Sequence, residues 1–482
     1  MKVTARDRLF RARPGRCPVI PPLGTPRGDS RRKRAVGGGA VIDRASPSDV
    51  AMLAMGAGAS LSQRAGAVLL LDPGTGFSVA QATALVADRI RSVPRLRRRL
   101  VRVPFGGGRP VWVDDPRFDL DLHVRERTCP APGDERALLD LAAEVLTGPL
   151  PPSRWTAVFV TGLSDGAVAL IVAFDHVLAD GIGGLALLAA LVDPARRPAP
   201  GGFPVPPPSL RSLAADAFAE RLRALGRVRG YARDAKTAMA ATGGLWPEPI
   251  ARCSLLRPTG PRRRFAVVRA DLAAVRSAAH RHGCTVNDAL LTAIIGALGR
   301  VLRRRGEHVG ELSVSVPVSA RPIASSSELG NRFGVLIAAL PVAGLPGQRM
   351  VRIAALLAGR KKAAAEASAA GLFGPMFRVL AAFGAYRWYL RHQRRIHTLV
   401  SNVRGPGRPL TFAGATIRQM IPVAVAESGN VTVSFEVLSY AGTLTITVIA
   451  DPDGVPDLDE LVAGLRHELA GAAVPALPAP AT

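Results

Sequence analysis

The pattern of apolar and polar positions predicts alternating strands and helices along most of the chain. Short apolar runs between turn residues predict strands, and apolar residues three to four positions apart predict amphipathic helices. In the first half the pattern predicts strands at 66–72, 155–162 and 166–174 and helices at 80–92, about 136–147 and 181–192. The strand at 166–174 is apolar throughout, which is typical of a strand that is buried on both faces of a sheet.

The second half repeats this alternation after a break that is rich in proline. Residues 196–208 (RRPAPGGFPVPPP) predict a linker, and a helical stretch follows to about residue 242. The pattern then predicts strands at 264–270 and 311–318, helices at 271–282 and 285–304, and a hairpin of strands 430–439 and 443–450. We therefore expect two mixed α/β domains, at 45–195 and 251–475, joined by a linker and connecting helix at 196–250.

Residues 1–44 differ from the rest in composition, because they are rich in Arg, Gly and Pro and hold twelve basic residues against three acidic ones. No apolar segment follows the basic residues, so we do not expect a secretory signal. Three interpretations stay open: a disordered arm, a gene start placed too early, or a basic tether to a membrane or lipid droplet.

The overall composition is that of a globular protein, with 48% hydrophobic and 21% charged residues. The formal net charge of +26 raises the question of nucleic-acid binding. Only five of the 63 basic residues are Lys, which indicates GC-rich coding bias as much as selection for a polyanion, and no zinc-ligand spacing or RNA-binding aromatic run is present. We therefore expect an anionic lipid surface or a nucleotide-bearing substrate as the partner of this charge, and no nucleic acid.

Cysteine usage and hydropathy bear on the cellular compartment. The four cysteines are far apart and form no CxxC pair, which argues against a disulfide framework and a metal site. No uninterrupted apolar run reaches the roughly 18–20 residues of a membrane-spanning helix. We expect a cytoplasmic protein that associates peripherally with the inner face of the membrane or with lipid inclusions.

Polar residues gather where the apolar strand at 166–174 ends, in the sequence DHVLADG at 175–181. A strand that ends at His176 delivers an imidazole to a loop, and imidazole can take a hydroxyl proton near neutral pH and return it to a leaving group. Asp180 can lock the loop by pairing with an arginine, and Gly181 lets the chain turn where a Cβ would obstruct it. His176 is the candidate general base, and a structurally satisfied histidine is the alternative.

Further segments accompany this motif in a fixed order over residues 46 to about 456. They are Ser46-Pro47-Ser48-Asp49, Trp112, Phe118-Asp119-Leu120 with His123-Val124, Pro149-Leu150 with Trp155, Val286-Asn287-Asp288, Val316-Pro317-Val318-Ser319 with Arg321, Leu329-Gly330-Asn331, Ser401-Asn402-Val403 with Gly405-Pro406 and Gly414, Ser439-Tyr440 with Gly442, Ala450-Asp451 and Val455-Pro456-Asp457. In this order they resemble the bacterial wax ester synthase/diacylglycerol acyltransferase family. That family belongs to the CoA-dependent acyltransferases, as do carnitine acyltransferases and peptide-synthetase condensation domains.

One position departs from the family pattern. The family motif usually begins with two histidines, and Asp175 stands in place of the first. The second histidine, which the family uses as its base, is retained as His176. An ionised Asp175 beside His176 would favour the protonated imidazole. The replacement fits an active enzyme, since related acyltransferases have HxxxDG alone, and it also fits a paralogue that has lost turnover.

The start of the helix at 285–304 carries two candidate residues. Thr285 is predicted to cap the helix, with Asp288 at its third position near the positive end of the helix dipole. Asp288 is therefore predicted to be structural. Asn287 either shapes the catalytic pocket or stabilises the start of the helix.

Three other candidates each have two interpretations. The resemblance implies that Arg321 pairs with Asp180, and a solvated arginine is the alternative. Ser401 and Asn402 either donate hydrogen bonds to the oxyanion of a tetrahedral intermediate or stabilise a turn beside Gly405.

The remaining aromatic and histidine positions predict structural roles. His123 is predicted to be structural. Residues 371–398 are basic and amphipathic, and they form either a helix at a membrane interface or one packed on the core. The other histidines lie among charged or helical residues and are expected at the surface: His280, His282, His308, His392, His397 and His467.

The resemblance implies two chloramphenicol-acetyltransferase-like α/β domains, each with a mixed sheet, and an active site at their interface. It implies acyl transfer from acyl-CoA to diacylglycerol, to a long-chain alcohol or to both, by direct attack of the hydroxyl on the thioester. Acyl-CoA is then a co-substrate, and no metal or prosthetic group is expected. The alternatives are another lipid or polyketide hydroxyl as acceptor, or a lipid-surface binding protein without turnover.

Overall fold

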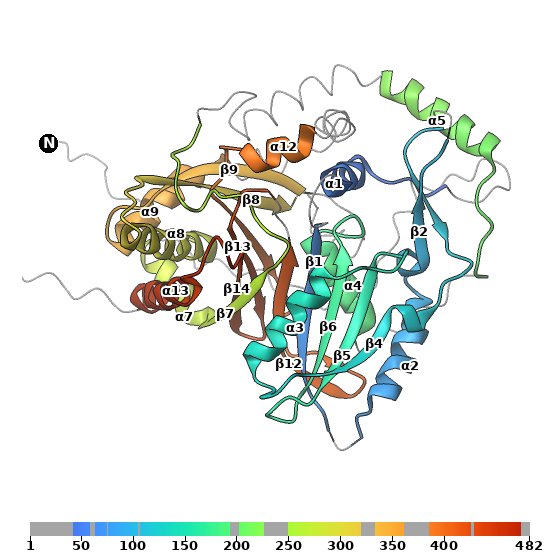
Figure 1. Cartoon of the computed structure of the whole chain (residues 1–482), viewed down its shortest axis with the longest axis horizontal. Helices are drawn as coiled ribbons and strands as arrows, with labels where there is room; N and C mark the ends of the chain where they lie inside the picture. Colours follow the sequence, from blue (N-terminus) through green and yellow to red (C-terminus); the bar gives the residue numbers. More distant parts are fainter. Residues whose placement is uncertain are drawn as a thin grey trace, which may run out of the picture. The chain divides into compact units, whose positions relative to one another are not determined.

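The computed structural model describes residues 42–57, 63–74, 76–104, 107–192, 202–225, 249–319, 333–360, 385–425 and 429–473 (Figure 1). The chain divides into two units, Met1–Gly39 and Ala40–Thr482, and every described residue belongs to the second. The predicted N-terminal extension therefore lies outside the described residues up to residue 41. Its last residues belong to the folded unit, because the Arg44 backbone forms a bridge with Val111.

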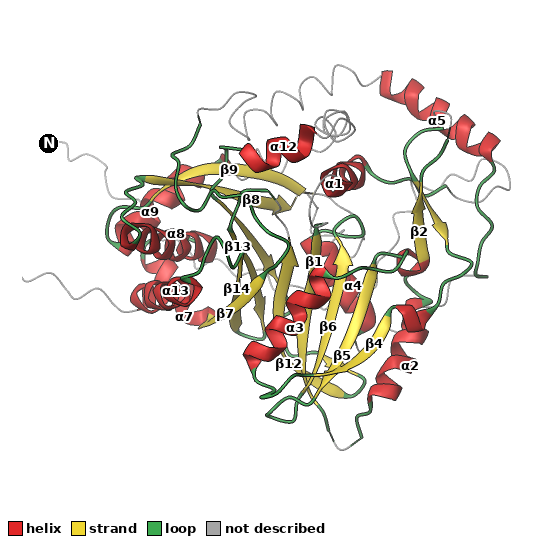
Figure 2. Ribbon diagram, viewed as in Figure 1, coloured by secondary structure: helices red, strands yellow, loops and turns green. Residues whose placement is uncertain are grey.

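The first of two six-stranded sheets has the order β11-β12-β1-β6-β5-β4 (Figure 2). Its strands are β1 (Arg64–Asp72), β4 (Val124–Thr128), β5 (Trp155–Thr161), β6 (Val168–Asp175), β11 (Thr411–Phe412) and β12 (Ala415–Val425). Pairing is antiparallel except between β4 and β5, so the sheet is mixed.

Strand β6 lies inside this sheet and is buried on both faces, as its apolar sequence predicts. Leu170, Val172 and Phe174 belong to the same apolar cluster as residues of α2 (Val79–Ile90) and α4 (Gly181–Leu191). The alternate residues, such as Ile171, belong to a second cluster with α3 (Glu135–Thr147). The residue that follows β6 is therefore delivered from the middle of a rigid, covered sheet.

The second sheet has the order β7-β14-β13-β10-β8-β9 and is also mixed. Its strands are β7 (Arg264–Asp271), β8 (Glu311–Ser319), β9 (Phe333–Pro341), β10 (Thr398–Arg404), β13 (Val433–Tyr440) and β14 (Thr443–Ala450). The helices that share its core are α7 (Leu272–Arg281), α8 (Val286–Arg304), α9 (Pro346–Leu357) and α13 (Leu458–Ala473). The β13–β14 hairpin turns at Ala441 and Gly442, whose φ angles of 46° and 85° are those of a tight hairpin turn.

The two sheets do not follow the predicted division of the chain at residue 251. Strands β11 and β12 come from the C-terminal half, yet β12 pairs with β1 from Thr416 to Val425. β12 also contacts β13 and β14 of the second sheet, and the Tyr440 hydroxyl donates to the Ile417 carbonyl at 2.8 Å. Residues 411–425 thus complete the first sheet, because the edge of β1 needs a partner for its backbone groups.

The other described elements are α1 (Pro47–Ala57), two 3₁₀ turns at Pro94–Arg97 and Leu120–Leu122, the β2–β3 pair (Arg98–Val101 and Val111–Asp114), α5 (Leu210–Leu225) and α12 (Ala385–His392). In the linker and the stretch after it, residues 202–209 form no helix or strand, and α5 ends at Leu225. Residues 226–248, the rest of the predicted helical stretch, lie outside the described residues. In the basic amphipathic stretch at 371–398, 371–384 also lie outside them, and α12 forms the described helix.

The described residues include no single helix with the length and hydropathy needed to cross a membrane. Helices α7 and α8 reach such a composition together, but they are bent by 94° relative to each other.

Candidate active site

The DHVLADG segment forms a tight connection between β6 and α4. β6 ends at Asp175, and α4 begins at Gly181, with Asp180 as its N-cap. The backbone N–H of His176 donates to the Gln63 carbonyl at 3.0 Å, and the His176 side chain is partly buried. The histidine is thus held by the sheet on one side and by a capped helix on the other.

Asp175 holds this connection together through both carboxylate oxygens. Oδ1 accepts the backbone N–H of Val177 at 3.0 Å, and Oδ2 accepts a guanidinium N–H of Arg154 at 2.7 Å. The ion pair offsets the charge of Asp175 next to His176. The residue that replaces the usual first histidine therefore has a structural function in the loop.

Asp180 is buried, and its Oδ1 accepts the backbone N–H of Gly183 at 2.7 Å. This N-cap bond fixes where α4 begins. Helix α4 packs closely on β6, since a Cβ at Gly184 would lie 2.6 Å from the ring of Phe174. The predicted partner of Asp180, Arg321, lies outside the described residues.

The apolar residues of the motif link the loop to the second sheet. Val177, Leu178 and Ala179 are fully buried, and they belong to the same cluster as Leu438 and Tyr440 of β13. The loop that carries His176 therefore lies at the contact between the two sheets.

The start of α8 has the predicted capping geometry. The Thr285 hydroxyl accepts the backbone N–H of Asp288 at 3.3 Å, and the Asp288 carboxylate accepts the backbone N–H of Thr285 at 2.9 Å. The capping predicted for Thr285 and Asp288 is therefore present. Asn287, which directly precedes Asp288, accepts a hydrogen bond from the Asn402 side-chain amide at 3.3 Å.

Ser401 and Asn402 extend from opposite faces of β10. Val400 belongs to the core beneath the helices of the second sheet, and Asn402 shares that direction and reaches α8. Val403 packs against the cluster that contains the motif loop, so Ser401 faces the contact between the sheets. The structure thus brings Asn402 to Asn287, and Ser401 to the opposite face.

Strand β10 separates from β8 close to Ser401. In β10, Thr398 and Leu399 pair with β8, whereas the residues from Leu399 to Arg404 pair with β13.

Glu436 is a site residue that the sequence analysis missed. It lies opposite Ser401 in the register of β10 and β13, is partly buried, and accepts a hydrogen bond from the Ser401 hydroxyl. Burial raises the pKa of the Glu436 carboxyl to about 7, and the Ser401 hydrogen bond opposes this rise. An acidic residue in the alternating strand VSFEVLSY was the available signal.

Two histidines are buried and structural. His123 is stacked between Phe118 and Trp155, and its Nδ1 lies 2.8 Å from the Trp155 carbonyl oxygen. Burial lowers the pKa of His123, and the structural role predicted for it is confirmed.

The prediction that His397 lies at the surface is wrong. His397 is fully buried, its Nδ1 accepts the Ser313 N–H at 2.9 Å, and its Nε2 lies 2.9 Å from the Ala251 carbonyl oxygen. Arg394 and Arg395, which precede it in the sequence, are themselves partly buried, so the charged neighbours did not indicate a buried histidine. The five other histidines for which a surface position was predicted are exposed.

Comparison with known proteins identifies the family. Residues 45–290 match the wax ester synthase/diacylglycerol acyltransferase catalytic domain, and residues 329–471 match the C-terminal domain of the same family. The chain belongs to this family. It is an acyltransferase with the fold of the CoA-dependent acyltransferases, as the sequence predicted.

Two mycobacterial members of the family are 30% identical to the chain. One is a probable diacylglycerol O-acyltransferase of Mycobacterium tuberculosis H37Rv, matched over 417 residues that cover 80% of this chain and 86% of the relative. Another protein of that organism with the same type of name matches over 448 residues, covering 85% and 94%.

Solved structures support the fold. The wax ester synthase/diacylglycerol acyltransferase from Marinobacter aquaeolei VT8 superposes with a TM-score of 0.61 at 22% identity, covering 89% of this chain and 98% of that one. The first condensation domain of the calcium-dependent antibiotic synthetase gives a TM-score of 0.58 at 17% identity, covering 91% and 98%. Both likenesses concern the fold alone.

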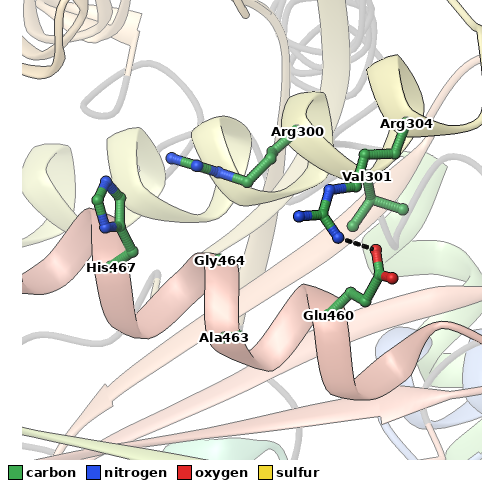
Figure 3. Close-up of a pocket in the computed structure, with 7 residues that line it drawn as sticks. All are labelled: Arg300, Val301, Arg304, Glu460, Ala463, Gly464 and His467. Atoms are coloured by element: carbon green, nitrogen blue, oxygen red, sulfur yellow. Dashed lines mark hydrogen bonds and ion pairs between the residues drawn. The ribbon is translucent and has the colours of Figure 1, made fainter.

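A separate hollow of about 210 Å³ lies between α8 and α13 of this acyltransferase (Figure 3). Arg300 and Arg304 line it from α8, and Glu460 and His467 line it from α13. Arg304 and Glu460 form an ion pair at 2.7 Å between the two helices (Figure 3). None of the residues that line it belongs to the DHVLADG segment.

Proposed function

We propose that this protein transfers a fatty acyl group from acyl-CoA to the hydroxyl of diacylglycerol or of a long-chain alcohol, with His176 as the general base. The observation that carries this proposal is the position of His176. It follows the central strand of the first sheet, its backbone is held at 3.0 Å from Gln63, and its loop packs with the second sheet. A base needs such fixed support if two substrates are to meet it at an interface.

The chemistry follows from the groups that face this contact. The imidazole of His176 takes the hydroxyl proton of the acceptor while the oxygen attacks the thioester carbon. The Ser401 hydroxyl donates to the oxyanion that forms. Collapse of the intermediate breaks the C–S bond, His176 returns the proton to the thiolate, and an ester and free CoA leave. These steps need no metal or prosthetic group, and acyl-CoA serves as co-substrate.

Other motif residues support this arrangement without touching the reacting atoms. Asp180 fixes the start of α4, and Arg321 is its proposed ion-pair partner. Asp175 ties the loop to Arg154. Asn287 and Asn402 join α8 to β10, which sets the position of the strand that carries Ser401.

We also propose that the protein works at an anionic lipid surface on the cytoplasmic side of the membrane or on lipid inclusions. Both acceptors are apolar, so the enzyme must reach them at an interface. Helix α5 offers a surface for this, because Leu210, Phe218, Leu222 and Leu225 are 63%, 62%, 53% and 69% exposed. Phe218, Leu222 and Leu225 are three to four residues apart and Leu210 lies about two turns before Phe218, which places all four on one side of the helix.

The charges and attachment of α5 fit an anionic interface. Arg211 and Arg221 are exposed on the same side of the helix as these apolar residues, and a basic amphipathic helix can lie in an anionic lipid interface with its apolar side chains inward. The opposite side of α5 is tied to the folded unit, since Arg44 bonds to Asp216 at 2.5 Å and to the Leu213 carbonyl at 2.7 Å.

The activity is tested with purified protein, palmitoyl-CoA and either dioleoylglycerol or hexadecanol, by following CoA release and ester formation. We expect His176→Ala to reduce kcat by about 10²–10⁴-fold, as is typical for loss of a general base. His308→Ala, the same change at an exposed histidine, serves as control and keeps wild-type turnover. Ester formation by His176→Ala at the wild-type rate would contradict the proposal, and the ratio of the two esters names the preferred acceptor.

The lipid surface is tested separately, by co-sedimentation with phosphatidylcholine vesicles with and without phosphatidylglycerol. We expect wild type to bind the anionic vesicles more tightly, and Phe218→Ser/Leu222→Ser to reduce binding. Val351→Ser, an exposed apolar position of α9, is the matched control. Unchanged binding of the double variant would exclude α5 as the contact surface.

A further inference from the structure

A row of three polar side chains crosses the face of the second sheet that meets the first. Ser401 of β10 lies opposite Glu436 of β13, and Glu436 lies opposite Thr447 of β14. Directly opposed residues extend to the same face of a sheet. Two residues further along β13 and β10, Leu438 and Val403 belong to or pack against the cluster that contains the motif loop. The row therefore adjoins the region where the proposed chemistry takes place.

The surroundings of Glu436 supply hydroxyl groups, and no described residue forms an ion pair with it. The charged side chains on its packing partners are few. β14 has none, β10 has the exposed Arg404, and β12 has Arg418, which pairs with two aspartates. The motif loop has three titratable groups: Asp175, which is paired with Arg154, His176, and Asp180, which caps α4.

The Thr447 hydroxyl is buried without a hydrogen-bond partner among the described residues. It lies next to Glu436 in the strand register. A neutral carboxyl group has one O–H donor and a carbonyl oxygen that can still accept. Glu436 in this form can donate to Ser401 on one side and accept from Thr447 on the other, which satisfies all three groups.

The direction of the Ser401 proton differs between the two forms of Glu436. An ionised carboxylate only accepts, so the single hydroxyl proton of Ser401 points to Glu436. A neutral Glu436 donates to the Ser401 oxygen instead, and the Ser401 proton is then available to another acceptor. In the proposed reaction that acceptor is the oxyanion of the tetrahedral intermediate.

We propose that Glu436 is a positioning residue for acyl transfer, whose neutral form turns the Ser401 hydroxyl toward the reacting carbonyl oxygen and whose ionised form turns it away. This inference rests on the proposed function, because it needs Ser401 as the donor to the oxyanion. In this proposal the Ser401 hydroxyl is a hydrogen-bond donor whose direction depends on the charge state of Glu436. Since burial raises the pKa of Glu436 to about 7, the change of form falls within the working pH range.

The test is a pH profile of kcat between pH 6 and pH 9 for wild type, Glu436→Gln, Ser401→Ala and the double variant, with palmitoyl-CoA and dioleoylglycerol. Glutamine imitates the neutral acid, because its N–H₂ donates to Ser401 and its oxygen accepts from Thr447. We expect wild-type kcat to fall above pH 7, by about tenfold at pH 8 if the ionised form is inactive. Glu436→Gln keeps its kcat over this range. Glu126→Gln, the same change on an exposed strand residue, keeps the wild-type profile.

The double variant separates a positioning role from a general effect on folding. Since Glu436 acts through Ser401, Glu436→Gln has no further effect on the profile once Ser401 is Ala. Equal alkaline limbs in wild type and Glu436→Gln would overturn the inference, as would a Glu436-dependent limb in the Ser401→Ala background. Failure of the proposed function is distinguishable, because it is seen as full turnover of His176→Ala at every pH.

Discussion

Asp175 and Glu436 are two carboxylates in similar places with opposite environments. Each lies beside a residue that the proposed reaction uses, Asp175 next to His176 and Glu436 opposite Ser401. Asp175 accepts from a guanidinium and from a backbone N–H. Glu436 accepts from one hydroxyl, and burial raises its pKa.

The difference between these environments divides the site into a fixed part and an adjustable part. A carboxylate that accepts from both a guanidinium and a backbone N–H joins two segments of the chain and can serve as scaffold. A carboxyl group whose pKa is raised to about 7, and which has no ion pair with a described residue, changes its charge near neutral pH and can serve as a switch for its neighbour. Asp175, which departs from the family motif, thus belongs to the fixed part of the site, where its ion pair with Arg154 holds the loop in place.

The largest effect that would sharpen this comparison is the change in unfolding free energy when Glu436 is replaced. The folded state binds the Glu436 proton more tightly than the unfolded state, in which the carboxyl has its ordinary pKa of 4.5. The free energy of unfolding therefore falls as pH rises from about 4.5 to about 7. Glu436→Gln removes this loss, and we expect it to be more stable than wild type by about 2–3 kcal/mol at pH 8 and by much less at pH 5. Urea unfolding at both pH values measures the difference, and an equal gain at pH 5 would show that packing, not charge, is responsible.

A smaller effect is expected where the carboxylate is paired. Arg154→Ala leaves Asp175 without its cation, but the arginine is 35% exposed, so water replaces part of the interaction. We expect a loss of about 1–2 kcal/mol of unfolding free energy, with reduced kcat because the loop loosens. Arg127→Ala removes an exposed pair with Glu144 and is the matched control. If both variants lose the same amount, Asp175 is not held as the structure indicates.

The smallest effect is expected on the other face of β10. Asn402→Ala removes a 3.3 Å hydrogen bond at an exposed position, which contributes about 0.5–1 kcal/mol. We expect kcat to fall only a few-fold, because Asn402 positions β10 and does not reach the contact between the sheets. Ser401→Ala provides the comparison, and a larger loss in Asn402→Ala than in Ser401→Ala would reverse the assignment of the two faces.

Much of the first half of the site could be predicted from the sequence. The apolar run before His176 has the length of one buried strand, and Asp180-Gly181 begins a helix, so strand, loop and helix follow from local pattern. The capping of α8 by Thr285 and Asp288 is equally local. In these cases the residues that determine the geometry are neighbours along the chain.

Other features depend on contacts between distant segments and were not predictable in this way. Residues 415–425 alternate as a strand, but nothing local tells which sheet they join. His397 lies among arginines, and its burial depends on Ser313 and Ala251, which are far away in the sequence. Glu436 could be recognised as a site residue only once the pairing of β13 with β10 placed it opposite Ser401.

The path of β12 means that the two halves of this enzyme are not interchangeable modules. An N-terminal fragment that ends at the linker would expose the edge of β1, and a C-terminal fragment would carry β12 without its sheet. Unpaired edges of this kind promote association between chains. Recombination between relatives therefore has to exchange residues 411–425 together with the N-terminal half, although they are encoded far downstream of it.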